Sequence, residues 1–196
     1  MCKYLNFVVY NGLMKATQQL KDEHQGIKIA LAVLEKISRR LEQGEDVQIG
    51  HLQQLLEFLQ VFVDRCHHSK EEEVLFPAMK KAGLPEGGPI QVMLAEHALG
   101  RNYIKGLSEA VKKYRSGDKP AGKEIAENAR GYSRLLESHI EKENNILYCL
   151  ADAVLDQKKQ DELFEEFEKI ETEKIGSGKH EQFHKLLDEL QKIYLQ

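Results

Sequence analysis

One arrangement of candidate metal ligands occurs twice in this chain of 196 residues. The stretches His67–Phe76 and His139–Tyr148 both read H-x-x-K-E-x-x-[VI]-L-aromatic, and they lie 72 residues apart. Residues separated by four positions on a helix share a face, one turn apart. Each stretch can therefore direct one imidazole and one carboxylate at the same point, as a metal site requires.

Each stretch also has a single histidine upstream. His24 lies 43 residues before His67, and His97 lies 42 residues before His139. An ionised glutamate in a helical core costs on the order of several kcal/mol unless it is paired or binds a metal. Imidazole with carboxylate suits iron, manganese or zinc, and two such half-sites form the ligand set of a dinuclear iron centre. We therefore predict six metal ligands: His24, His67, Glu71, His97, His139 and Glu143.

The register of the first half-site has an alternative. One residue further on, His68 and Glu72 repeat the spacing of four. The second repeat has Ile140 and Asn144 at the matching positions, so comparison of the two repeats favours His67 with Glu71. In that register His68 either supports the site from behind or is exposed.

Three other residues lie close to the predicted ligands in the sequence. Glu23 and Glu96 each precede a ligand histidine, and one residue out of phase they are expected to face solvent or to cap a neighbour. Tyr132 lies seven residues before His139 on the same apolar stripe. It is expected to fill the core, with a hydrogen-bond donor beside the ligands as the alternative.

A second motif is expected not to be a catalytic site. The stretch His180–His184 reads H-E-x-x-H, which is the pattern of zinc proteases. No histidine follows it, and the glycines just before it favour a peripheral, mobile helix.

Helix breakers divide the chain into four long helical segments and a tail, and no β-branched alternation indicates strands. The long segments are expected at about 14–42, 48–81, 89–116 and 121–155. Their apolar residues follow the alternating spacing of a bundle seam, with the candidate ligands inside the stripes. The sequence thus predicts an all-α fold, an antiparallel up-down-up-down four-helix bundle with one or two extra C-terminal helices. We expect an N-terminal extension at 1–13, the bundle at 14–155 and a C-terminal helical appendage at 156–196.

The composition of the chain limits the classes of molecule that are expected to bind it. The formal net charge is −4 and no basic stripe is visible, so we expect no nucleic-acid partner. Charges interrupt every apolar run, so we expect no membrane span. Three cysteines without C-x-x-C spacing suit a reducing cytoplasm, where we expect the protein to be located.

The pattern H…H-x-x-x-E…H…H-x-x-x-E, with the phrases at 66–77, 88–90 and 96–101, resembles the hemerythrin-like (HHE cation-binding) family over about 14–155. The resemblance implies two iron ions inside a four-helix bundle. It implies that His24, His67, His97 and His139 are terminal ligands. Glu71 and Glu143 would bridge the irons together with an oxo, hydroxo or water ligand.

The chain differs from the oxygen-carrying hemerythrins of that family. Those have a second histidine four residues from the first on the third helix, whereas Met93 and Arg101 occupy these positions here. Their last carboxylate is an aspartate five residues after its histidine, whereas Glu143 lies at four. The expected site therefore has one nitrogen ligand fewer and is nearly symmetric, which argues against reversible oxygen storage.

The sequence thus predicts a non-haem di-iron protein that binds or reduces a small diatomic or peroxidic ligand, namely dioxygen, peroxide or nitric oxide. Detoxification of peroxide or nitric oxide is the enzymatic form of this hypothesis. The alternative is an iron-binding sensor or reservoir without turnover, and manganese or zinc are alternative metals. The oligomeric state does not follow from the sequence.

Overall fold

The computed structural model describes residues 15–176 and 178–196, and in this part of the chain all regular elements are helices, with no strand. The predicted all-α class is confirmed for these residues. The expected extension at 1–13 lies outside them. Among the described residues, no helix combines the length and apolar character needed to cross a membrane.

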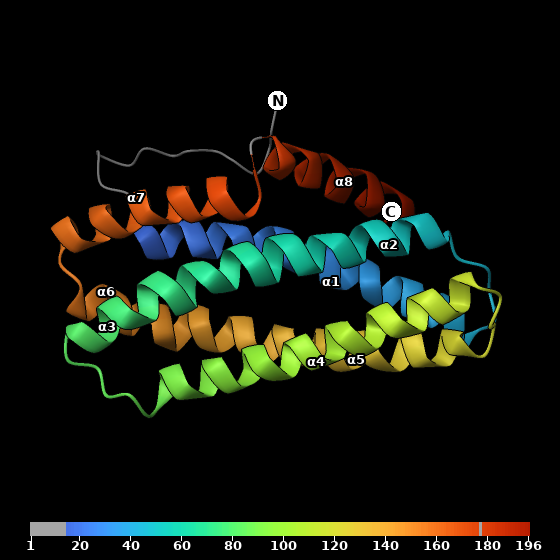
Figure 1. Cartoon of the computed structure of the whole chain (residues 1–196), viewed down its shortest axis with the longest axis horizontal. Helices are drawn as coiled ribbons and strands as arrows, with labels where there is room; N and C mark the ends of the chain where they lie inside the picture. The colour runs from blue at the N-terminus through green and yellow to red at the C-terminus, as the bar shows by residue number, and fades with distance from the viewer. Residues whose placement is uncertain (1–14, 177) are drawn as a thin grey trace.

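Four long helical segments lie along one another (Figure 1). The first is α1 (Ala16–Glu42) and the third is α4 (Pro89–Arg115). The second is continuous from α2 (Ile49–Phe58) through the π-helices η1 (Leu59–His68) and η2 (Lys70–Leu75) to α3 (Phe76–Lys81). The fourth runs from α5 (Ala121–Lys142) through the π-helix η3 (Glu143–Leu147) to α6 (Tyr148–Val154).

The ends of these segments follow from turn chemistry. Gly83 and Gly117 have φ values of 102° and 101°, a conformation that L side chains rarely adopt and that ends a helix. Pro89 begins α4, where its missing N–H has no helical acceptor to lose. The predicted segment limits agree closely with these boundaries.

The interior contains two apolar clusters with the candidate ligands between them. The first cluster includes Leu34, Leu55, Leu107, Leu136 and Leu187. The second cluster includes Leu20, Phe76, Met93, Tyr148 and Phe167. Along α1 the chain passes from the second cluster to the first, whereas along the next segment it passes from the first to the second. The order reverses again in the third and fourth segments, so successive segments run in opposite directions (Figure 1).

Both ligand stretches adopt π-helical turns. The π-helix pairs residues five apart, so its turn is wider and the angle between successive side chains is smaller than in an α-helix. In the second segment, π-helix surrounds the pair His67 and His68. In the fourth segment, it begins at Glu143. Such widened turns are often found at functional sites.

Two further helices cover the segments from one side. The helix α7 (Gln157–Lys174) packs along α1 and η2 and contributes Phe167 to the second cluster. The helix α8 (Lys179–Tyr194) packs along α1 and α2 and contributes Phe183 to the first cluster. Both helices therefore belong to the apolar core, and the expectation of a mobile α8 is not supported by its burial.

Candidate metal centre

All six predicted ligands lie together in the layer between the apolar clusters, and His68 joins them. The side chains form two buried groups, in each of which the ligand atoms lie within 4.8 Å of one another. One group contains His24, His67 and Glu143, and the other contains His68, Glu71, His97 and His139. Every segment contributes, because α1, η1, η2, α4, α5 and η3 each supply at least one of these residues.

The imidazole nitrogens meet in pairs. The Nε2 atoms of His24 and His67 are 3.1 Å apart, and those of His97 and His139 are 3.0 Å apart. Two nitrogens that bind one ion at about 2.1 Å and at right angles lie about 3.0 Å from each other. The spacing of both pairs therefore fits two histidines that share an ion.

The two carboxylates lie between the histidine pairs. Glu143 places Oε2 3.2 Å from His24 Nε2 and Oε1 2.9 Å from His139 Nε2. Glu71 places Oε2 3.4 Å from His97 Nε2 and 3.9 Å from His67 Nε2. Each carboxylate thus reaches both pairs, which is the arrangement that a carboxylate bridging two ions needs.

The hydrogen bonding of these carboxylates also fits a metal. Both oxygens of Glu143 and Oε2 of Glu71 are buried without a hydrogen-bond donor. Buried carboxylate oxygens cost free energy unless a donor or a cation satisfies them. The donor set of imidazoles and carboxylates suits iron, manganese or zinc. The residues present therefore fit a metal centre.

Each half of the centre orients a histidine through a glutamate from the preceding long helix. Glu23 on α1 accepts a hydrogen bond from His67 Nδ1 at 2.7 Å, and Glu96 on α4 accepts one from His139 Nδ1 at 2.9 Å. A proton held on Nδ1 leaves the Nε2 lone pair for a metal. The expectation that Glu23 and Glu96 face solvent or cap a neighbour was wrong, because interhelical packing turns both toward the next helix.

The repeated lysine of the motif positions these glutamates. Lys70 contacts Glu23, and Lys142 contacts Glu96. Burial alone would raise the pKa of Glu23, but the charge of Lys70 and the hydrogen bond with His67 lower it to about 2. Glu23 therefore stays ionised, and its charge strengthens the basicity of the imidazole it holds.

The other two Nδ1 atoms have different partners. His24 Nδ1 is 2.9 Å from Asn144 Oδ1, and His97 Nδ1 is 2.6 Å from Glu72 Oε1. Asn144 and Glu72 occupy matching positions of the two repeats. Arg101 also donates to Glu72, at 2.8 Å. The two halves are thus alike in geometry. They differ in charge, because a neutral amide contacts Nδ1 of His24 whereas a carboxylate contacts Nδ1 of His97.

His68 lies in the candidate centre in addition to the register that was chosen from the sequence. His67 and Glu71 both lie in the centre, as predicted, but His68 is also buried and stacks on His97 with ring centroids 3.9 Å apart. Comparison of the repeats left this residue as a supporting or exposed histidine, because Ile140 replaces it in the second copy. The widened turn of the π-helix brings the two neighbouring histidines into the same interior. A fifth imidazole therefore makes the centre less symmetric than expected.

Two tyrosines differ in their relation to the centre. Tyr148 donates a hydrogen bond to Glu71 Oε1 at 2.8 Å, and Phe76 occupies the matching position of the other repeat. Burial, together with the charges of Glu143 and Glu71, raises the pKa of Tyr148, so its hydroxyl remains a donor. Tyr132 instead lines a pocket that also reaches His68.

The H-E-x-x-H pair lies apart from this centre. The rings of His180 and His184 are 4.5 Å apart, and His180 Nδ1 lies 3.6 Å from Glu171. Neither histidine joins a group of three or more metal-binding side chains among the described residues. A protease site at this pair therefore receives no support.

An all-helical fold with buried imidazoles and carboxylates between two apolar clusters defines a class of helical metal-binding proteins. The model of the hemerythrin HHE cation binding domain matches residues 15–151, and the chain belongs to this family. It is 23% identical over 163 residues to uncharacterized proteins of Mycobacterium bovis and Mycobacterium tuberculosis, covering 83% of this chain. The chain spans 64% of the length of these relatives.

Proposed function

We propose that this chain is a non-haem di-iron protein that binds or reduces dioxygen, peroxide or nitric oxide. In this proposal the four long segments form the antiparallel four-helix bundle of the family, and residues 156–196 are an appendage to it. The observation that carries the proposal is the position of Glu71 and Glu143 between two pairs of imidazoles, with carboxylate oxygens that lack a donor. His24, His67 and Glu143 would hold one ion, and His68, Glu71, His97 and His139 the other.

When bound, a pair of iron ions supplies exchangeable coordination positions and electrons for a small ligand. The protein supplies orientation and a closed environment. Glu23, Glu96, Glu72 and Asn144 fix the four imidazole rings through their Nδ1 atoms. The Tyr148 hydroxyl keeps one oxygen of Glu71 in place. The apolar clusters on both sides limit the access of water.

Metal analysis after anaerobic purification is the first test. We expect close to two iron ions per chain, and zinc or manganese in the same amounts would contradict iron as the metal. Ferrous protein is then mixed with dioxygen, hydrogen peroxide or nitric oxide. Repeated consumption of one of these ligands supports catalysis, whereas a single stable adduct per centre supports binding without turnover.

A sensor is the second candidate, and one contact favours it. Lys70 joins Glu23, which holds His67, to Glu171 on α7 at 3.0 Å. Changes at the metal centre can thus reach α7 through the ion pairs of Lys70 with Glu23 and Glu171. If the protein is a sensor, hydrogen exchange of α7 differs between the iron-loaded and iron-free forms.

A further inference from the structure

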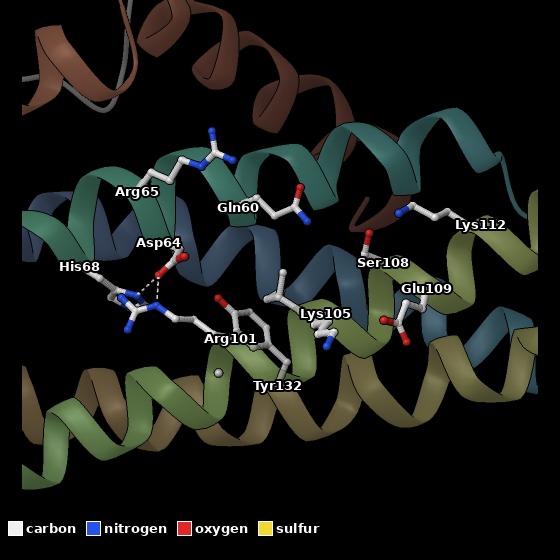
Figure 2. A pocket seen from close by; sticks show the side chains of 12 residues that line it. Gln60, Asp64, Arg65, His68, Arg101, Lys105, Ser108, Glu109, Lys112 and Tyr132 are labelled. Carbon is white, nitrogen blue, oxygen red and sulfur yellow. Dashed lines mark hydrogen bonds and ion pairs between the residues drawn. The ribbon is translucent and has the colours of Figure 1, made fainter.

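A pocket of about 460 Å³ lies beside the candidate metal centre (Figure 2). It runs between η1 and α4, with His68 at one end and Lys112 toward the other, and Tyr132 from α5 lies below (Figure 2). Sites for small organic molecules span roughly 300–1,000 Å³, whereas a water molecule takes up about 30 Å³ of liquid. The pocket is therefore much larger than a diatomic ligand requires.

The lining of this pocket carries more positive than negative charge. Arg65, Lys105 and Lys112 lie along it, and none of them forms an ion pair with another described residue. Of the two carboxylates in the lining, Asp64 is held by Arg101 at 2.7 Å, which leaves Glu109. A cavity lined by an excess of one charge concentrates ligands of the opposite charge. The pocket thus favours anions.

One part of the pocket wall is apolar and carries the hydroxyl of a tyrosine. Gly100 and Ile104 form part of its wall, and the ring of Tyr132 forms another part. Tyr132 is 2% exposed, and within the described part of the chain its hydroxyl has no hydrogen-bond partner (Figure 2). The hydroxyl oxygen is not one of the fully buried atoms without a partner, so it stays accessible from the pocket that Tyr132 lines. An oxygen or nitrogen acceptor on a ligand in the pocket would satisfy it.

The metal-side end of the pocket is closed by a charged contact. Arg101 donates to Asp64 at 2.7 Å and to Glu72 at 2.8 Å, and Glu72 accepts from His97. His68 lies at the same end of the pocket, with its Nδ1 3.5 Å from Asp64 Oδ1 (Figure 2). A molecule in the pocket can therefore contact the candidate ligand His68, whereas Arg101 lies between the pocket and Glu72, which holds His97.

We propose that this pocket binds a small organic carboxylate, with its carboxylate near Lys105 and Lys112 and its apolar body against Ile104 and Tyr132. The end of the ligand opposite the carboxylate would point toward His68. The proposal extends the function proposed above, because it names an organic acid as a substrate or effector of the same metal centre. The residues that bind the acid lie outside the candidate ligand set, so the two proposals can fail separately.

The test uses the full iron-loaded chain and three probes: benzoate, its uncharged analogue benzamide, and inorganic phosphate. Titration calorimetry should show benzoate binding at least tenfold more tightly than either of the others. The double variant Lys105→Gln/Lys112→Gln should bind benzoate about tenfold more weakly, as expected for the loss of two exposed ion pairs. The matched control is Lys36→Gln/Lys123→Gln, which removes the same charge from exposed positions outside the pocket and should bind like the unchanged chain.

Benzoate binding no tighter than benzamide would overturn the proposal, and so would equal losses in the two double variants. If phosphate bound as tightly as benzoate, the pocket would attract anions in general. This result would overturn the proposal that its ligand is an organic acid. Iron per chain is measured in the same samples. Iron without benzoate binding contradicts the pocket proposal alone, and benzoate binding without iron contradicts the di-iron proposal alone.

Discussion

Lys70 Nζ lies 2.5 Å from Glu23 Oε1 in the interior of the protein. Lys70 is fully buried, and it also contacts Glu171 of α7. Burial favours the neutral form of this lysine, yet the neighbouring Glu23 and Glu171 carboxylates raise its pKa and keep it charged. The matching lysine of the second repeat, Lys142, is partly exposed and contacts only Glu96 among the described residues.

Replacement of this buried lysine should be far more harmful than replacement of its counterpart. Lys70→Gln leaves Glu23 buried without its cation and should lower the free energy of unfolding by about 3–5 kcal/mol. Lys142→Gln breaks a pair that is still partly exposed to solvent and should lower it by only about 1 kcal/mol. Denaturant unfolding of both metal-free variants measures the difference, and equal losses would mean that burial does not distinguish these pairs.

His68→Ala tests whether the fifth imidazole binds metal. We expect the affinity for one of the two ions to fall by at least about tenfold, since even the loss of a supporting residue has an effect of that size. Iron per chain after dialysis against a weak chelator measures this loss. His184→Ala is the control and should retain both ions. Full iron retention in His68→Ala would place this residue outside the ligand set.

Tyr148→Phe removes a hydroxyl that donates to a buried carboxylate. A hydrogen bond to a charged group contributes about 1.5–3 kcal/mol, so the metal-free variant should lose stability in this range. Tyr132→Phe is the matched control, because its hydroxyl has no partner among the described residues, and it should be close to neutral. Thermal unfolding of both variants decides, and similar shifts would show that the contact of Tyr148 with Glu71 is not stabilising.

The two cysteines described by the structure should differ in reactivity. Cys66 is buried and Cys149 is exposed. Burial raises the pKa of the Cys66 thiol to about 12, and only the thiolate is a good nucleophile. In a Cys2→Ser background, a chromogenic disulfide at pH 8 should modify one thiol of the native protein and two after denaturation. Rapid modification of two thiols in the native state would contradict the burial of Cys66.

The metal-free protein should lose stability as the pH rises. Burial lowers the pKa of His97, but the neighbouring carboxylates of Glu143, Glu71 and Glu72 raise it to about 11. The pKa values of His67 and His139 are also raised, against burial, by glutamate neighbours. A raised pKa contributes stability that is complete below the unfolded value of about 6.5 and disappears toward the folded value. The melting temperature of the metal-free form should therefore fall between pH 6.5 and 10, and an increase would contradict these shifts.

The sequence was sufficient to predict the helices and to bring six candidate ligands together. Helix breakers such as Gly83 and Gly117 act locally, and the repeated spacing of histidine and glutamate shows a shared helix face. The residues behind the histidines were missed for a different reason. Glu23 on α1 contacts His67 on η1. Such a contact depends on how two helices pack against each other, and the spacing of residues within one helix does not determine this packing.

His68 was expected to support the site from behind or to be exposed, because the second repeat has Ile140 at the matching position. Successive side chains on an α-helix lie about 100° apart, whereas the wider turn of a π-helix lets two neighbouring histidines face the same interior. The amino-acid sequence contains no pattern from which a π-helix would have been predicted here. The repeated lysine and the glutamate before each upstream histidine were visible in both copies, and this recurrence was a signal that could have indicated supporting roles.

The widened turn at His67 and His68 matters to anyone who transplants this centre into an artificial scaffold. If the same residues were placed on an ideal α-helix, one of the two imidazole rings would point away from the ions. The grafted centre would then lack a nitrogen donor, although every ligand residue was present in the sequence. The transferable unit is thus a stretch of sequence together with its irregular backbone.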